Sequence, residues 1–377
     1  MFACENALGL CFLSGAVHDE DESAFTKGEL EAAFREAGLG TVEFYYPMPE
    51  YKRAQTVYSD RYLPGKGDIP HVTAVYDRQR WACIHEDEIS DKLVQEKAFG
   101  LFANAYLAVA SKEQEPFDTI FAKYNRTRKP QFQIRTRILE ENGKRYVEKA
   151  ALTEASGAHI GSMEEKHEKL SKVNPEVRVL EPHFSEDKQA VRFEFLTGKT
   201  LAEELGGQIR GKKAPVEAIQ AAMEQVFSKA ALRPESFYVT PEFLEVFGRN
   251  PAEDSQDSAS GELEQQLSAL SDASYAVSNI DGLFENLMVS GGKLYCLDYE
   301  WVFDFPVPAG FVRYRNLVYF YYKYEGLMDY ENAADFLKEF GIGEELSGLY
   351  AAMEESFQSW VHGDGTQGIW VIINSVW

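Results

Sequence analysis

The chain has 377 residues, 45% of them hydrophobic, which is enough for two domains with apolar cores. Its 61 acidic and 38 basic residues give a net charge of −23, which argues against nucleic acid or an anionic membrane surface as a general partner. The four cysteines show no C-x-x-C spacing, and no apolar run reaches the ~18 residues of a membrane span. We therefore expect a cytoplasmic protein without a zinc site, a disulfide framework or a membrane span. Its oligomeric state is unknown from the sequence.

The first 110 residues predict a helix and several strands. Thr26–Glu29 is typical of a capping box, and the helix that it opens should stop at Gly38. Val42–Tyr46 alternates as a strand does, and we expect Pro47 and Pro49 to end it. Two more strand candidates and a closing linker follow: 56–58, 105–109 and 111–116.

The pattern changes after residue 118. Two strands, 131–139 and 145–150, flank Asn142-Gly143, which is a strong hairpin signal. A helical stretch over 153–170 and a strand over 190–196 come next.

The rest of the chain is mostly helical by its pattern. The Ser/Ala-rich segment 250–272 carries six acidic and no basic residues, so we expect part of it to be a mobile loop. The aromatic run 317–322, flanked by basic residues, predicts a buried helix.

The most informative feature is an Asp, an Asn five residues later, and a second Asp at the end of the next apolar strand. These are Asp281, Asn286 and Asp298. Phosphoryl transfer needs a carboxylate that takes the proton of an attacking hydroxyl, together with oxygen ligands that hold magnesium against the nucleotide phosphates. Apolar strands on both sides of 290–292 predict a hairpin that brings Asn286 and Asp298 together. The alternative is a simple tight turn, because Asn, Asp and Gly all favour turns.

Further candidates lie upstream. Lys149 ends an apolar strand just before a helix, where it could contact nucleotide phosphates and pair with a helix glutamate, or lie at a solvated strand edge. Three glutamates are alternative partners: Glu164, Glu165 and Glu168. Phe193–Lys199 leaves a strand through glycine, as a hinge between two lobes would, with Glu194 as a candidate for adenine binding.

Positive charge is concentrated in one part of this acidic chain. Residues 120–149 hold nine basic and three acidic side chains. A bound polyphosphate would account for the excess, and so would a solvated sheet face. Arg126 and Arg128, in the glycine-free loop 123–129, are candidate phosphate ligands through their side chains.

These residues occur in the order of a two-lobed kinase, and residues 118–360 resemble the protein-kinase-like superfamily in its aminoglycoside phosphotransferase and choline kinase branch. The resemblance implies a kinase-like domain over 118–377, with an N-lobe of about 118–197 and a C-lobe of about 198–377. It also implies that ATP and Mg²⁺ are cofactors, that Lys149 contacts phosphates, that Asp281 is the catalytic base, and that Asn286 and Asp298 bind magnesium. Glu300 matches the branch as well. Two departures are Asn279, where the family usually has His, and the loop without glycine.

Residues 1–112 resemble the C-terminal half of a class I S-adenosylmethionine-dependent methyltransferase. The matching segments are 5–10, the helix from Thr26, and 44–52. No G-x-G-x-G loop occurs in this block, so we expect no S-adenosylmethionine binding by this chain. If 1–4 is the end of the fifth strand, four strands are missing.

The expected fold class is thus α/β and α+β: a partial Rossmann-like segment followed by a two-lobed kinase-like domain. The favoured function is ATP- and Mg²⁺-dependent phosphoryl transfer to a hydroxyl of a small molecule or glycan, in the context of bacterial surface polysaccharide synthesis. The alternatives are a pseudokinase-type binding or scaffold module, and a fragment of a bifunctional methyltransferase–kinase-like protein.

Overall fold

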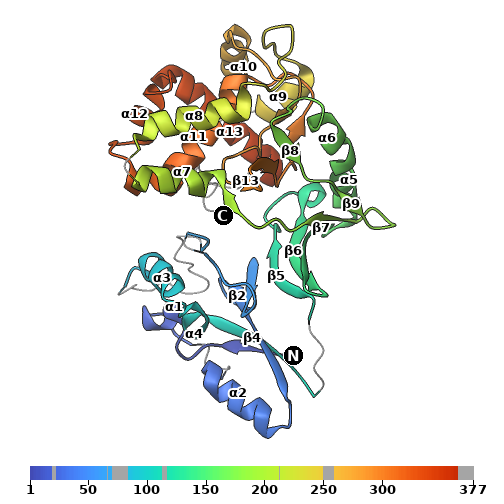
Figure 1. The fold of residues 1–377 in the computed structure, drawn as a ribbon, viewed down its shortest axis with the longest axis vertical. Helices are drawn as coiled ribbons and strands as arrows, with labels where there is room; N and C mark the ends of the chain where they lie inside the picture. Colours follow the sequence, from blue (N-terminus) through green and yellow to red (C-terminus); the bar gives the residue numbers. More distant parts are fainter. Residues whose placement is uncertain are drawn as a thin grey trace. The chain divides into compact units, whose positions relative to one another are not determined.

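The computed structural model describes residues 1–18, 23–65, 67–69, 84–112, 117–211, 213–248 and 259–363. These residues form two compact units, which we describe separately: unit 1 ends at Ser156 and unit 2 begins at Gly157 (Figure 1). The expected domain boundary at 112–118 stays a prediction. Strands on the two sides of that linker pair directly, with Thr56 opposite Lys123, so one sheet continues across it.

The described part of unit 1 is built on one antiparallel sheet with the strand order β1-β4-β2-β3-β5-β6-β7. Its strands are β1 (Phe2–Glu5), β2 (Thr41–Met48), β3 (Thr56–Ser59), β4 (Ala105–Ser111), β5 (Thr119–Tyr124), β6 (Ile134–Glu141) and β7 (Lys144–Ala151). Its helices are α1 (Leu10–Leu13), α2 (Lys27–Glu36), α3 (Glu86–Gln95) and α4 (Phe99–Phe102), with short 3₁₀ turns η1 (Pro130–Phe132) and η2 (Glu154–Ser156).

Local sequence signals determine several of these boundaries. Thr26 caps α2 through the backbone N–H of Glu29, and the Glu29 carboxylate accepts from the N–H of Thr26, which confirms the predicted capping box. The predicted hairpin is also present, and its turn residues Asn142 and Gly143 have φ of 51° and 73°. Positive φ at both positions is what an Asn-Gly turn favours.

The prediction that Pro47 ends its strand is wrong. β2 continues to Met48, and Pro47 lies opposite Val57 of β3. The reason is the pairing of β2: its contact with β4 ends at Tyr45, so Pro47 lies where the strand has a neighbour on one side only. A strand with one open side accommodates a residue that has no N–H.

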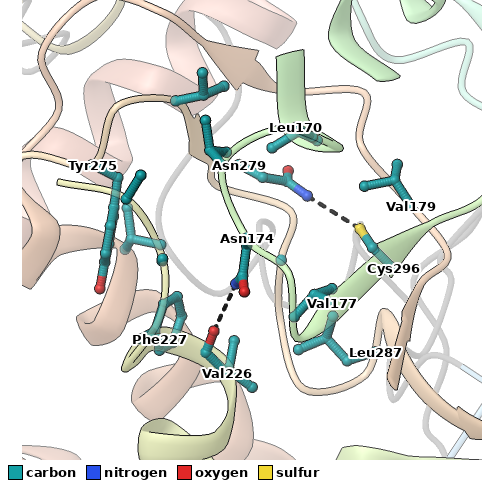
Figure 2. Close-up of a pocket in the computed structure, with 16 residues that line it drawn as sticks. Leu170, Asn174, Val177, Val179, Val226, Phe227, Tyr275, Asn279, Leu287 and Cys296 are labelled. Carbon is teal, nitrogen blue, oxygen red and sulfur yellow. Dashed lines mark hydrogen bonds between the residues drawn. The ribbon is translucent and has the colours of Figure 1, made fainter. Parts of the chain in front are cut away.

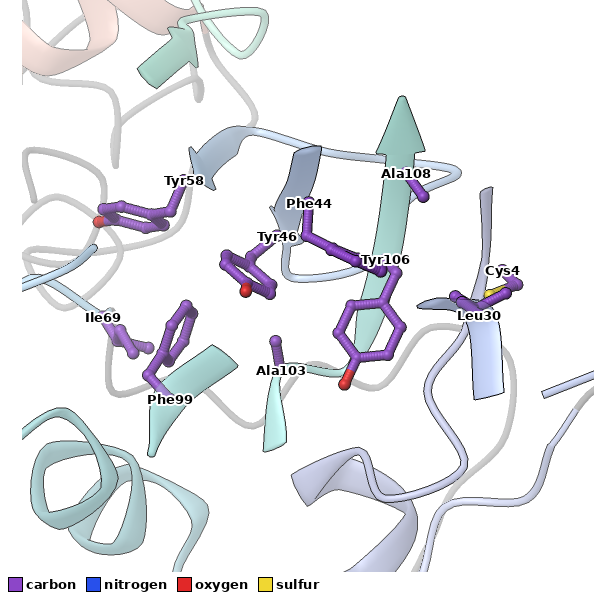
Figure 3. Packing of buried hydrophobic residues seen from close by; sticks show 10 residues of the cluster. All are labelled: Cys4, Leu30, Phe44, Tyr46, Tyr58, Ile69, Phe99, Ala103, Tyr106 and Ala108. Carbon is purple, nitrogen blue, oxygen red and sulfur yellow. The ribbon is translucent and has the colours of Figure 1, made fainter. Parts of the chain in front are cut away.

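Aromatic side chains fill the core of unit 1 (Figure 3). Tyr46 and Tyr106 are completely or almost completely buried, and the Phe44 and Tyr106 rings meet edge to face at 5.7 Å. Phe99 from α4 packs edge to face on Tyr46 and on Tyr58. Helix α4 is therefore attached to the sheet by ring packing, a geometry that stabilises by about 0.5–1.5 kcal/mol a pair beyond area burial.

A Rossmann-like sheet in residues 1–112 is not confirmed. Every strand pair described there is antiparallel, whereas the Rossmann sheet is mostly parallel.

Unit 2 is mainly helical and contains two small sheets and one further strand pair. Its strands are β8 (Val177–Val179), β9 (His183–Phe184), β10 (Ala190–Glu194), β11 (Lys199–Thr200), β12 (Ser278–Asn279), β13 (Leu287–Ser290), β14 (Lys293–Cys296) and β15 (Val302–Phe303). Its helices are α5 (Gly157–Gly161), α6 (Met163–Leu170), α7 (Leu201–Arg210), α8 (Pro215–Phe227), α9 (Pro241–Phe247), α10 (Ala259–Ala269), α11 (Ala309–Tyr324), α12 (Ala333–Lys338) and α13 (Glu344–His362), with the 3₁₀ turn η4 (Glu325–Leu327).

Two of these elements test the predictions for the second half of the chain. The aromatic run lies in α11, ten of whose residues are buried, as predicted. The segment 250–272 is only partly described: residues 250–258 lie outside the described residues, and 259–269 form α10. Leu263 and Leu267, one turn apart, are buried, so α10 is a packed helix, and the prediction that part of 250–272 is a mobile loop stays a prediction. None of the described helices is both long and apolar enough to span a bilayer.

Two neighbouring glycines of α7 provide a matched test of packing. An added Cβ would lie 2.6 Å from the Tyr324 ring at Gly206, whereas at Gly207 it would meet nothing within 4 Å. We expect Gly207→Ala to stabilise unit 2 by about 0.5–1 kcal/mol through helix propensity, and Gly206→Ala to destabilise it by about 1–3 kcal/mol through overpacking. Urea unfolding of both variants measures this. Equal midpoints would mean that Tyr324 moves aside without cost.

Candidate active site

The loop that carries Asp281 is held at both ends by backbone pairing. β12 pairs with β15, with Asn279 opposite Val302, and the Ile280 N–H donates to the carbonyl of Trp301 at 3.1 Å. At the other end the Asn286 N–H donates to Leu283 O at 2.8 Å, and Leu297 N–H to Asn286 O at 2.8 Å. The loop therefore joins β12, which pairs with β15, to β13, which pairs with β14, and both of its ends are fixed.

The predicted hairpin after this loop is confirmed. β13 and β14 pair with Leu287 opposite Cys296, and Gly291 and Gly292 form the turn with φ of 56° and 73°. This pairing places Asn286, one residue before β13, beside Leu297, one residue after β14. Asn286 and Asp298 therefore lie at the same end of one hairpin, as their proposed role requires.

Asn279 links the loop to the hairpin through its side-chain amide. Its Oδ1 accepts from the Asp281 N–H at 3.0 Å, and its Nδ2 donates to the carbonyl of Asp298 at 3.2 Å. The Cys296 thiol donates to the same carbonyl at 3.1 Å. The backbone positions of Asp281 and Asp298 are thus tied to one planar group.

Asp281 is half-buried, and its groups are oriented by two neighbours. Its Oδ2 accepts from the Trp301 N–H at 3.1 Å, and its carbonyl accepts from Asn286 Nδ2 at 3.0 Å. A carboxylate oriented by a backbone N–H, on a loop with fixed ends, has the preorganised geometry that a general base needs.

The oxygen donors of Asn286 and Asp298 fit a magnesium–nucleotide complex. Since Asn286 Nδ2 donates to Asp281 O, its planar amide directs Oδ1 to the opposite side. Asp298 Oδ1 accepts from the Glu300 N–H at 3.2 Å, which orients this carboxylate. Among the described residues no group of three or more His, Cys, Asp or Glu side chains is placed to hold a metal ion. Mg²⁺ commonly takes one or two protein ligands and completes its shell with phosphate and water, and this set fits that pattern.

A buried ion pair lies behind Asp281, and the sequence patterns did not single it out. Arg315 of α11 is 2% exposed, pairs with Glu354 of α13 at 2.7 Å, and donates to the carbonyl of Ile280. Burial opposes the guanidinium charge, but Glu354, Tyr319 and Asp281 outweigh it, so the pKa of Arg315 is raised. Tyr319 and Gln358 both donate to Oε1 of Glu354. An arginine on the apolar face of a helix was the available sequence signal.

A second buried pair, His159 and Glu300, was also missed as a pair. His159 Nε2 lies 3.8 Å from Glu300 Oε2, both residues are buried, and the His159 ring lies against Trp301 at 4.8 Å. The amine of Lys166 donates to the Glu300 carbonyl.

The three helix glutamates proposed as partners of Lys149 are all exposed. Glu164 pairs with Lys188 at 2.7 Å, and Glu165 with Lys169 at 2.6 Å.

The hinge candidate begins where β10 ends at Glu194, whose side chain is exposed. A Cβ on Gly198 would lie 2.5 Å from the carbonyl of Val289, so only glycine lets this segment pass so close to β13.

The other predicted nucleotide ligands lie in unit 1. Lys149 is in β7, opposite Thr136, and is 6% exposed, so it is not a solvated edge lysine. Arg126 is exposed, with its guanidinium 4.4 Å from the centre of the Tyr124 ring and a hydrogen bond to Ala54 O. The Arg128 carbonyl accepts from Gln133 at 2.8 Å.

Three of the nine basic side chains in residues 120–149 contact acidic side chains of the same segment, so the net basic excess of the segment remains. Arg135 and Arg137 both contact Glu148, while Arg145 pairs with Glu140 at 2.8 Å. The hydrogen bond from Arg145 also stabilises the charged form of Glu140, because it lowers the pKa of the Glu140 carboxyl. These ion pairs favour a charged sheet face as the explanation for these three arginines.

Neither a protein-family model nor a curated protein matches the sequence. Solved structures that resemble the chain include small-molecule phosphotransferases. Choline kinase LicA from Streptococcus pneumoniae is 15% identical with a TM-score of 0.36, over 64% of this chain and 82% of that one. A thermostable mutant of aminoglycoside phosphotransferase APH(4)-Ia is 15% identical with a TM-score of 0.34, over 60% and 84%. Macrolide 2'-phosphotransferase MphH from Brachybacterium faecium is 14% identical with a TM-score of 0.29, over 66% and 82%. Similarity at this level establishes neither activity nor substrate.

Removal of both partners from the buried ion pair should cost less than the sum of the two single removals. We expect Arg315→Met to destabilise unit 2 by about 3–5 kcal/mol, because it leaves the Glu354 carboxylate buried without its cation. In a double-mutant cycle, the double variant with Glu354→Gln should lose about 1–3 kcal/mol less stability than the sum of the two single losses. Chemical unfolding of the variants measures these losses. Lys188→Met, which breaks the exposed pair with Glu164, is the control and should have little effect. Additive effects of the two buried changes would contradict the coupling.

Proposed function

We propose that the chain transfers the terminal phosphoryl group of ATP, with Mg²⁺, to a hydroxyl of a small molecule or glycan. The observation that carries the proposal is the Asn279 amide, which ties the loop of Asp281 to the strand end of Asp298. A base and two oxygen donors held in one preorganised unit are what phosphoryl transfer requires of a protein.

In this proposal Asp281 accepts the proton of the acceptor hydroxyl while that oxygen bonds to the terminal phosphorus. The bond from phosphorus to the bridging oxygen breaks, and the nucleoside diphosphate leaves with its electron pair. The Trp301 N–H keeps Asp281 Oδ2 in place, so that the other carboxylate oxygen is directed for proton transfer. Asn286 and Asp298 would hold Mg²⁺, which neutralises charge on the phosphates when bound.

The remaining roles follow the sequence resemblance. Lys149 would contact the nucleotide phosphates, Arg126 and Arg128 would add positive charge for them, and Glu194 would contact the adenine edge. We place the reaction in the cytoplasm and in bacterial surface polysaccharide metabolism.

Two other functions remain as alternatives. Asn279 in place of the usual His, together with the glycine-free loop 123–129, favours a pseudokinase-type binding or scaffold module. Residues 1–112 keep their sequence resemblance to part of a methyltransferase, which favours a fragment of a bifunctional protein.

Measurement of Mg²⁺-dependent ATP binding by thermal shift, followed by ATP turnover with amino alcohols, aminoglycosides and sugars, separates an enzyme from a binding module. Absence of any nucleotide-dependent shift at millimolar ATP would refute the phosphotransferase.

Removal of the base should stop the chemistry and leave nucleotide binding intact. Asp281→Asn keeps an oxygen that accepts from the Trp301 N–H, but the amide cannot take a proton. We expect turnover to fall by about 10²–10⁴-fold while the dissociation constant of Mg-ATP changes little. Asp329→Asn, an exposed acidic residue of the same unit, is the charge-matched control. Turnover by Asp281→Asn at the wild-type rate would exclude Asp281 as the base.

Removal of the Asp298 charge should act through the metal. Asp298→Asn keeps the acceptor for the Glu300 N–H but removes the anionic oxygen ligand. We expect the extra affinity that Mg²⁺ gives to ATP, measured by titration calorimetry with Mg²⁺ and with a chelator, to fall by at least about tenfold. Affinity for metal-free ATP should be unchanged or higher, since a negative charge is lost. An equal loss with and without metal would indicate a folding defect in place of a lost ligand.

A further inference from the structure

A cavity of about 70 Å³ lies in unit 2 directly behind the loop of Asp281 (Figure 2). Its lining is mostly aliphatic and comes from elements far apart in sequence, with Leu170, Val177, Val179, Val226 and Leu287 among its residues. Asn279 and Cys296 are also in the lining, and Figure 2 shows their side chains joined by a hydrogen bond of 3.3 Å.

The polar side chains of the lining already have partners within the protein. Asn174 donates to the Val226 carbonyl and accepts from the Glu176 N–H, and the Tyr275 hydroxyl accepts from Arg313. Asn279 and Cys296 are occupied by the bonds to the loop described above. A trapped water needs two to four polar partners, so this cavity suits hydrocarbon better than water.

The volume of the cavity limits the size of its ligand. A water-sized group needs roughly 10–15 Å³, so there is room for about five such groups. The lining is graded in exposure: Ala231 is exposed and Val177 is half-buried, whereas Leu287 and Cys296 are buried. A chain can therefore enter at Ala231 with its polar end in water and its alkyl end at Cys296.

The inner end of the cavity is in contact with the groups that position the site. Asn279 and Cys296 both donate to the Asp298 carbonyl, and Gly282, also in the lining, follows Asp281 in the chain. An alkyl group packed against Asn279 and Cys296 restricts the movement of the same side chains that hold Asp281 and Asp298.

We propose that this cavity is a binding site for the short alkyl end, about five carbons long, of an effector, and that its occupation tightens Mg-ATP binding. The alkyl site stands on the cavity alone. The effect on nucleotide rests on the proposed function.

A series of 1-alkanols tests the site without reference to activity. From 1-propanol to 1-pentanol the dissociation constant should fall about fourfold per methylene, and longer chains should gain little more. The measurement is the NMR shift of the Asn279 side-chain amide on titration, at alkanol concentrations that leave the circular dichroism unchanged. Ala230→Leu, which fills the lining, should abolish the chain-length dependence, and Ala221→Leu, on the exposed face of the preceding helix α8, should retain it. Affinity that rises steadily beyond hexanol, or no shift at Asn279, would overturn the site.

A second titration tests the coupling. With 1-pentanol bound, the dissociation constant of Mg-ATP should fall by about fivefold or more, and Ala230→Leu should abolish this response. Pentanol binding with an unchanged Mg-ATP affinity would overturn the coupling and leave the site. Absence of Mg-ATP binding by the wild type, with the alkanol series intact, would overturn the proposed function and the coupling together but still support the alkyl site.

Discussion

The candidate site depends on one side-chain amide that bonds two backbone segments at once. Asp281 and Asp298 are separated by a hairpin, and paired strands alone fix only the ends of that hairpin. The Asn279 amide adds the cross-link: its acceptor and donor are fixed in one plane, so a shift of either segment breaks a bond on the other side. Each of these part-buried hydrogen bonds contributes about 0.5–1.5 kcal/mol net, so an arrangement that breaks both is disfavoured.

Charge reinforces this arrangement from behind. A buried Arg315–Glu354 pair is no evidence of high stability, because desolvation offsets most of its attraction. Its value here is positional. Arg315 donates to the carbonyl directly before Asp281, and two more groups on α11 and α13, Tyr319 and Gln358, hold the counter-charge. The loop is thus attached to the two long helices as well as to the hairpin.

What the sequence predicted well are features whose signals are local. The Asn142-Gly143 turn, the Thr26 capping box and the hairpin at Gly291-Gly292 each depend on a few adjacent residues. What it missed depends on partners that are distant in sequence. Pro47 is tolerated because β4 ends its pairing at Tyr45, and Arg315 pairs with a residue 39 positions away. The helix α10 was not singled out within 250–272, although the spacing of Leu263 and Leu267 is a local signal for it.

Asn279 lies where the kinase-like proteins that the sequence resembles usually have His, and the two side chains offer the same kinds of hydrogen bond. A neutral histidine offers one ring donor and one ring acceptor, and an asparagine amide offers an oxygen acceptor and an NH₂ donor. In this loop the Asp281 N–H can only donate and the Asp298 carbonyl can only accept, so the amide orientation follows from its partners. The amide also cannot titrate, whereas protonation would turn a histidine into a donor on both sides and break the bond from Asp281. Asn279 therefore preserves the connection between the two aspartates, and it does so independently of pH.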